Sequence, residues 1–163
     1  LKEQSPVAER HAAVIETPPA NLFLLDSLLR TNFTPGQCGQ AQLKWLAEAL
    51  DKRSDKPAIV VAHHYPEKFV KSGLLDIKEL YEVLLPRKQV KAFIFGHSHA
   101  WQVSEHEGIQ LINVPATAWV FSTAVAAGWV EATLSADRIS LVRRCLDPTN
   151  PKDGEKAELK WRT

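Results

Sequence analysis

The chain has 163 residues, of which 45% are hydrophobic and 24% charged, the proportions of an ordinary globular domain. Its 20 Lys and Arg residues nearly balance 19 Asp and Glu residues, which excludes a nucleic-acid or anionic-membrane surface built on a basic excess. The longest apolar stretches, such as residues 58–62 and 92–95, are far shorter than the roughly 20 residues of a membrane-spanning helix.

The first third of the chain predicts two strands and a helix. Residues 11–16 (HAAVIE) and 21–27 (NLFLLDS) are short apolar runs that end in turn-forming residues, as strands do. Residues 31–39 (TNFTPGQCG) are typical of a loop. Apolar residues then recur at steps of three and four, which predicts an amphipathic helix over residues 40–53.

The middle of the chain repeats this alternation. Residues 58–62 (AIVVA) and 90–95 (VKAFIF) have the continuous apolar character of strands covered on both faces. Between them, residues 76–85 predict a helix, for which Asp76 and Glu79 form a candidate capping box. Strands that alternate with helices in this way indicate an α/β fold with parallel strands.

After His99 the pattern changes to short strand-like segments without helices, which predicts an antiparallel meander. These segments are residues 101–108, 109–114, 127–135 and 138–146. The polar, Pro- and Gly-bearing residues that follow predict a surface extension. We therefore divide the chain into a domain part, residues 1–146, and a C-terminal extension, residues 147–163.

Two histidine pairs follow two of the predicted strands. His63 and His64 come after one strand, and His97 and His99 after the next, preceded by Gly96, which would let the backbone turn tightly. Parallel neighbours would bring both pairs to the carboxyl edge of the sheet, where α/β proteins bind ligands. Either pair alone is commonly a polar turn, but together they indicate a metal site, because neutral imidazole ligates Zn, Fe, Mn and Ni.

The remaining candidates have simpler interpretations. His11 and His106 lie outside any such pattern and are interpreted as surface or packing residues. Cys38 and Cys145 lack zinc-ligand spacing and are interpreted as two free thiols. Trp101 is close enough to His99 to line a pocket.

Two motifs resemble a known family. The stretch VVAHHYP followed by FIFGHSH resembles the C-terminal half of the calcineurin-like metallophosphoesterases, which include purple acid phosphatases and class III cyclic nucleotide phosphodiesterases. The resemblance extends over roughly residues 22–117. It implies a mixed β-sandwich flanked by helices in four layers (αββα), to which this chain would contribute the C-terminal half, as one sheet and its helices.

The same resemblance implies roles for individual residues. His64 and His97 match ligands of one metal ion, and His99 matches a ligand of the other. His63 is the variable neighbour, to which we assign a catalytic contact with the substrate. Asp26 matches a recurring position of structural or supporting character.

The implied reaction is hydrolysis of a small phosphoester, either a monoester or a diester. Its cofactors would be two divalent or mixed-valence ions chosen from Mn, Fe, Zn and Ni, which together activate water and polarise the phosphoryl group. Tyr65, beside His64, and Trp101 are the predicted substrate contacts.

The family also needs Asp-x-His, Gly-Asp-x-x-Asp and Gly-Asn-His-Asp/Glu motifs, and no segment before His64 supplies them. Three imidazoles are too few ligands for two metal ions. We therefore expect this chain to be the C-terminal half of a longer enzyme, inactive alone, whose principal partner is the N-terminal half of the same domain.

Two alternatives remain open. One is a non-catalytic half-domain that acts as a metal-binding or interaction module. The other is an amidohydrolase-like or β-lactamase-like metallohydrolase. Those families place His-x-His in contexts such as HxHxDH, and no aspartate follows GHSH here.

Overall fold

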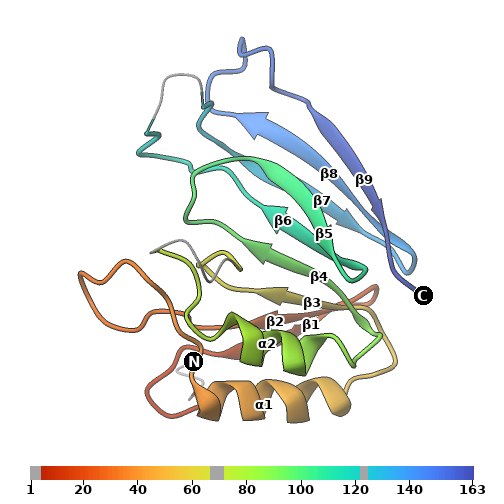
Figure 1. Cartoon of the computed structure of the whole chain (residues 1–163). Coiled ribbons are helices and arrows are strands. Elements are labelled where there is room, and N and C mark those ends of the chain that lie inside the picture. Colours follow the sequence, from red (N-terminus) through yellow and green to blue (C-terminus); the bar gives the residue numbers. More distant parts are fainter. Residues whose placement is uncertain (1–4, 67–71, 122–124) are drawn as a thin grey trace.

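The computed structural model describes residues 5–66, 72–121 and 125–163, and these fold into two β-sheets and two helices (Figure 1). Along the chain the elements are β1 (Ala13–Glu16), β2 (Asn21–Leu24), α1 (Gln40–Asp51), β3 (Ala58–Val61), α2 (Ile77–Leu84), β4 (Val90–Phe95), β5 (Gln102–His106), β6 (Ile109–Asn113), β7 (Gly128–Leu134), β8 (Arg138–Cys145) and β9 (Lys156–Lys160). The larger sheet has the strand order β1-β2-β3-β4-β6-β5, and the smaller has the order β7-β8-β9. No helix within the described ranges has the length and apolar character needed to cross a membrane.

The strands and helices predicted between residues 11 and 95 are confirmed, and so is the parallel pairing of β3 with β4. The meander predicted after His99 is only partly correct. β5 and β6 form an antiparallel hairpin, and β7, β8 and β9 form an antiparallel sheet. However, β6 pairs in parallel with β4, because β5 carries the chain back along the edge and leaves β6 to enter between them.

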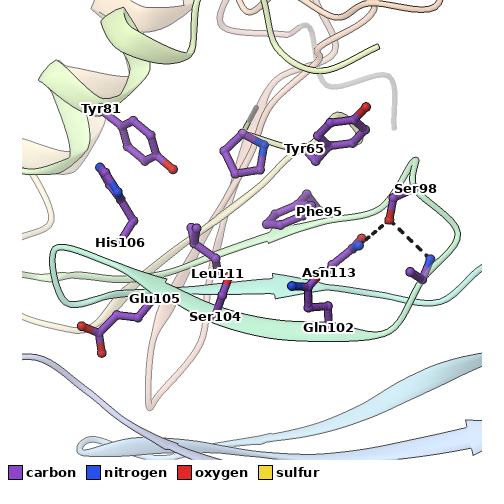
Figure 2. A pocket seen from close by; sticks show the side chains of 12 residues that line it. Tyr65, Tyr81, Phe95, Ser98, Gln102, Ser104, Glu105, His106, Leu111 and Asn113 are labelled. Atoms are coloured by element: carbon purple, nitrogen blue, oxygen red, sulfur yellow. Dashed lines mark hydrogen bonds between the residues drawn. The ribbon is translucent and has the colours of Figure 1, made fainter. Parts of the chain in front are cut away.

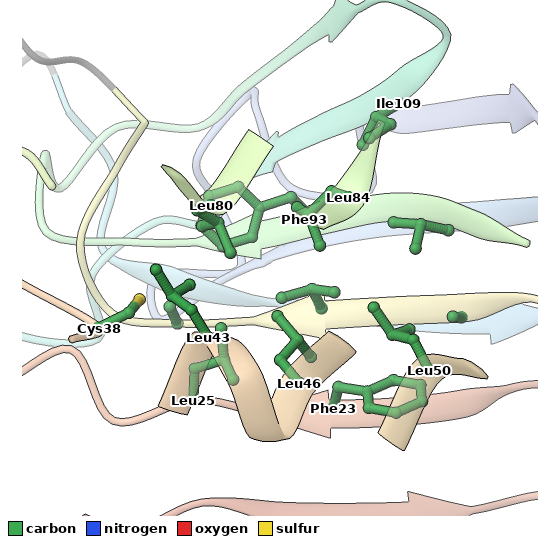
Figure 3. Close-up of a cluster of buried hydrophobic side chains, with 14 of the residues drawn as sticks. Phe23, Leu25, Cys38, Leu43, Leu46, Leu50, Leu80, Leu84, Phe93 and Ile109 are labelled. Carbon is green, nitrogen blue, oxygen red and sulfur yellow. The ribbon is translucent and has the colours of Figure 1, made fainter. Parts of the chain in front are cut away.

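Both helices cover one face of the larger sheet and enclose the first hydrophobic core (Figures 1 and 3). Helix α1 buries Leu43, Leu46 and Leu50, which recur at helical spacing and pack against residues such as Phe23 and Phe93. Each large apolar side chain removed from water contributes roughly 1.5–3 kcal/mol. This core therefore holds the strands in place and, with them, the loops at their carboxyl ends.

The opposite face of the larger sheet packs against the smaller sheet through a second core. Ile59 and Ile112 from the larger sheet meet Ile139 and Leu141 from β8. The expectation that the chain supplies one sheet is therefore wrong, because it contributes two sheets that pack on each other. The alternating pattern of β8, with every second residue buried, is what makes this second layer possible.

The tail also differs from the polar surface extension that we expected. Residues 156–160 form strand β9, which pairs with β8, and Trp161 is buried in the second core. The Arg162 guanidinium then donates hydrogen bonds to the carbonyls of Val90 (2.9 Å) and Arg87 (2.7 Å), near the end of α2. Only one side of β9 is apolar, so its charged residues concealed its strand character in the sequence.

Asp76 lies at the N-cap position of α2, but the predicted capping box is wrong because its side chain makes no cap hydrogen bond there. Its carboxylate instead accepts the backbone N–H groups of Cys38 (3.0 Å) and Gly39 (2.7 Å), directly before α1. Burial, followed by the charge of Asp76, raises the pKa of the Cys38 thiol to about 12. Cys38 and Cys145 are both buried and free, as predicted.

Trp161 tests whether the C-terminal residues belong to the fold. We expect Trp161→Ala to lower the free energy of unfolding by about 3–5 kcal/mol, because it removes a buried aromatic side chain and leaves a cavity between the sheets. The neighbouring exposed Lys160→Ala should change it by less than about 0.5 kcal/mol. Urea unfolding measures both, and equal effects would contradict the assignment.

Candidate metal centre

Both histidine pairs lie at the carboxyl edge of the larger sheet, as predicted. Val61 pairs with Ile94 at the ends of β3 and β4. The backbone pairing continues beyond them, because Ala62 N–H donates to the Ile94 carbonyl (3.1 Å) and Gly96 N–H donates to the His63 carbonyl (3.0 Å). These bonds hold the two histidine-bearing loops side by side.

Three imidazoles converge there, and they belong to His63, His64 and His97. One nitrogen atom from each ring lies within 4.8 Å of the others. The ring centroids are 4.6–5.0 Å apart. Nε2 of His63 and Nδ1 of His97 lie 2.9 Å apart, and one of them donates a hydrogen bond to the other. The cluster thus includes His63, to which we assigned a contact with the substrate, together with the two histidines expected to share one ion, and the ligand roles of these residues stay predictions.

A loop before α1 holds His64 in place. His64 is 4% exposed, and its Nε2–H donates to the Thr34 carbonyl (3.0 Å). The Ser27 hydroxyl donates to Nδ1 over 2.8 Å. Gly36 leaves the space for the ring, since a Cβ at that position would lie 2.2 Å from Nδ1. Contacts with Thr34, Ser27 and Gly36 therefore fix the orientation of this imidazole.

The backbone of the second pair is strained at the histidines themselves. His97 and His99 have φ values of 67° and 59°, in the left-handed region that residues other than Gly adopt uncommonly, although His, Asn and Asp do so more often than the rest. Gly96 needs no such freedom, because a Cβ there would make only ordinary contacts, the nearest at 3.8 Å from Val114. The tight turn that we assigned to Gly96 is therefore made by the two residues expected to bind metal, a location typical of functional sites.

His99 lies at the rim of the cluster. Its Nδ1–H donates to the Trp119 carbonyl (2.6 Å), and its ring stacks on Phe121 at 4.4 Å. This hydrogen bond leaves Nε2 free. His64 donates to the Thr34 carbonyl in the same manner. Histidines that bind metals commonly donate their second ring N–H to a carbonyl or carboxylate, which fixes the tautomer.

The three histidines of the cluster have lowered pKa values. Burial, and then the charge of His99, lowers the pKa of His63. Burial, with His97 and His63 close by, lowers the pKa of His64 to about 4. Burial and the same kind of repulsion lower the pKa of His97. The three rings are therefore neutral at pH 7, and their lone pairs are available to a cation.

These residues fit a transition-metal ion. Metal–nitrogen bonds of about 2.0–2.1 Å would place imidazole nitrogens around one ion roughly 3–4 Å apart, so the cluster needs only small movements to bind one. Imidazole suits Zn, Fe, Mn and Ni. In the parts of the chain that the structure describes, the cluster consists of imidazoles alone.

The other predicted residues have different outcomes. Tyr65 tilts against His97, with ring centroids 5.8 Å apart, and lines a cavity beside the cluster. Trp101 instead packs against the second core. It lines neither this cavity nor a second one, which is lined by His63, His97 and His99. Asp26 is structural, since its carboxylate accepts the N–H groups of His11 (3.1 Å) and Leu28 (2.9 Å).

Sequence reasoning missed Ser27, Thr34 and Gly36. They act on a histidine that lies 28 to 37 residues further along the chain, and the contacts depend on tertiary packing. The proline and glycine of this segment indicated a loop, and no local pattern indicated which side chain the loop contacts.

The fold and the histidine cluster define an α/β protein with a candidate metal centre at the carboxyl edge of its sheet. Residues 14–101, more than half of the chain, match the family of calcineurin-like phosphoesterases, and the chain belongs to this family. It is 35% identical over 115 residues to the 3',5'-cyclic adenosine monophosphate phosphodiesterase CpdA of Haemophilus influenzae, covering 63% of this chain and 42% of that protein. It is 28% identical over 130 residues to CpdA of Vibrio vulnificus, covering 71% and 47%.

Solved structures show the same fold. A dimetal phosphatase from Danio rerio superposes with a TM-score of 0.73 at 15% identity, covering 94% of this chain and 61% of that one. GAP50 of Plasmodium superposes with a TM-score of 0.62 at 14% identity, covering 94% and 54%. The chain spans somewhat less than half the length of the two curated relatives. The predicted metallophosphoesterase-type fold is therefore confirmed.

Gly36 tests how His64 is positioned. We expect Gly36→Ala to weaken Mn²⁺ or Zn²⁺ binding about 10- to 100-fold, because the new methyl group displaces the imidazole. Gly96→Ala should have a much smaller effect, because it meets only ordinary contacts. Isothermal titration calorimetry measures the affinities, and circular dichroism checks the fold. Similar affinities for the two variants would refute the positioning role.

The lowered pKa of His64 predicts how acid affects the metal-free fold. Below pH 6.5 the unfolded chain takes up a proton on His64, whereas the folded chain resists it down to pH of about 4. Stability should therefore fall across that window and be unaffected by this group above it, with a slope of at most about 1.4 kcal/mol per pH unit. Urea unfolding with a chelator present should show a shallower pH dependence for His64→Gln. Parallel curves for the two proteins would count against the shift.

Proposed function

We propose that this chain forms part of a metal-dependent phosphodiesterase whose substrate is a cyclic nucleotide or a similar phosphodiester. The observation that carries the proposal is the convergence of three neutral imidazoles at the carboxyl edge of the sheet, with a fourth at its rim. The names of the relatives, which are cyclic adenosine monophosphate phosphodiesterases, support a diester over a monoester.

In this proposal His64 and His97 bind one ion and His99 binds a second. The Nε2 of His99 is free because its Nδ1–H is bonded to Trp119. For His64 the nitrogen available is Nδ1, which requires the Ser27 hydroxyl to turn away from it. Nε2 of His97 is the available atom, since its Nδ1 is paired with His63.

The ions would supply activation of water and neutralisation of the charge that develops on the phosphoryl oxygens. His63 contributes from the protein side. Its Nε2 is bonded to His97, so its Nδ1 remains to face the substrate. We propose that Nδ1–H of His63 donates to a phosphoryl or leaving-group oxygen, which orients the diester. The left-handed backbone at His97 and His99 restricts the directions that these two side chains can take, which supports a site arranged in advance.

Three imidazoles are too few protein ligands for two ions. We propose that oxygen ligands from outside the described residues complete the centre. The second candidate function is a non-catalytic module that binds one ion, and the imidazole-only cluster favours it, because such a set can hold a single ion without carboxylates.

The test combines metal content with activity. We would measure moles of Mn, Fe, Zn and Ni per mole of the chain, and phosphodiesterase activity of the chain together with protein that supplies the oxygen ligands. We expect His97→Ala and His99→Ala each to reduce the rate of diester hydrolysis by a factor of about 100 or more, because each removes a ligand.

The exposed His11→Ala is the matched control and should retain both metal and activity. A protein that binds one ion and hydrolyses no diester would identify the non-catalytic module. Full activity in both His97→Ala and His99→Ala would overturn the proposed function.

A further inference from the structure

A cavity of about 500 Å³ lies next to the histidine cluster, because Tyr65 lines the cavity and its ring lies against that of His97. Figure 2 shows the side chains that line it. We call it the aromatic cavity. It lies between α2, the residues after β3 and the β5–β6 hairpin, and its size is within the range of small-molecule sites. Its lining includes Tyr65, Tyr81, Phe95, Ser98, His106 and Asn113.

Aromatic rings form part of the walls of the aromatic cavity. Tyr81 of α2 and His106 of β5 stack with centroids 4.2 Å apart, and Figure 2 shows them at one end of the cavity with Tyr65 and Phe95 further along. Burial raises the pKa of Tyr81 to about 12, so its hydroxyl stays protonated and uncharged. Flat, apolar faces of this kind favour a planar ring as ligand.

The charge of the cavity excludes a phosphate group. Among the described residues that line it there is no Lys or Arg, and Glu105 is the only carboxylate. A phosphate would find no counter-charge there, whereas a neutral aromatic ring would meet no repulsion. The cavity and the histidine cluster thus differ in the chemistry that they accept.

Asn113 supplies a hydrogen-bonding group. It is 6% exposed, and its Nδ2 donates to the Ser98 hydroxyl, while its Oδ1 has no partner (Figure 2). A buried amide oxygen without a partner is unusual in a folded protein. This oxygen is enclosed, and a ligand N–H group would satisfy it once a small rotation of the amide turned it toward the cavity, which favours a nitrogen-containing ring.

The aromatic cavity adjoins the candidate metal centre. Tyr65 lies against His97 at 5.8 Å between ring centroids, and Ser98 separates His97 from His99 in the chain. One molecule can therefore place a phosphodiester at the histidines and a ring in the cavity. We propose that the aromatic cavity binds the base of a nucleotide substrate, an inference that rests on the proposed function for the position of the phosphate.

Adenosine, which has a base but no phosphate, tests this binding on the purified chain by isothermal titration calorimetry. We expect adenosine to bind and ribose not to bind. Ser104→Trp, which fills the cavity from an exposed strand position, should weaken adenosine binding at least about tenfold, and Asn113→Leu should do the same by removing the amide. Thr133→Trp, at an exposed position of β7, is the matched control and should bind as the unaltered chain does.

The proposal is overturned if the unaltered chain does not bind adenosine, or if Ser104→Trp binds it equally well. Circular dichroism of each variant excludes unfolding as the cause of a loss. Because adenosine carries no phosphate, the result is independent of metal content. Adenosine binding together with full activity of both His97→Ala and His99→Ala would leave the cavity assignment standing and refute the proposed function. Loss of activity in these two variants without adenosine binding would refute the cavity assignment and leave the proposed function standing.

Discussion

The candidate site depends on the hydrogen bonds that continue beyond the ends of β3 and β4. They tie the loop of His63 and His64 to the loop of His97, two segments more than thirty residues apart in the sequence. Parallel strands place their carboxyl ends at one edge, and the helix-covered core keeps the strands in register. The imidazole cluster and the cavity beside it both depend on this edge.

The charges at this carboxyl edge of the larger sheet determine which ligands it can bind. Among the described residues no carboxylate belongs to the cluster of three imidazoles. Burial, followed by repulsion between neighbouring histidines, lowers their pKa values, so they remain neutral ligands. The described residues that line the neighbouring cavity include rings and an amide but no Lys or Arg. Two adjacent environments of different polarity are suited to a ligand with two chemically different ends, which is what a nucleotide is.

The secondary structure up to residue 95 and the place of the histidines could be predicted, because both depend on local patterns: apolar periodicity and residues that directly follow strands. What failed depended on contacts distant in sequence. The carboxylate of Asp76 serves α1 rather than its own helix, and Gly36 matters only because His64 lies against it. Trp161 is part of the core because β9 extends the smaller sheet, which a charged pentapeptide does not suggest.

Arg162 binds carbonyl groups at the end of α2 and the start of β4, the end of the larger sheet opposite the histidines (Figure 1). The smaller sheet is thus fastened at the amino end of these strands as well as near their carboxyl end, where Trp101 and Val114 pack against the second core and the Gly128 N–H donates to the Ala116 carbonyl. Attachment at both ends limits how far one sheet can slide over the other. The last residues of the chain therefore help to keep the strand ends, and the histidines that follow them, in one position.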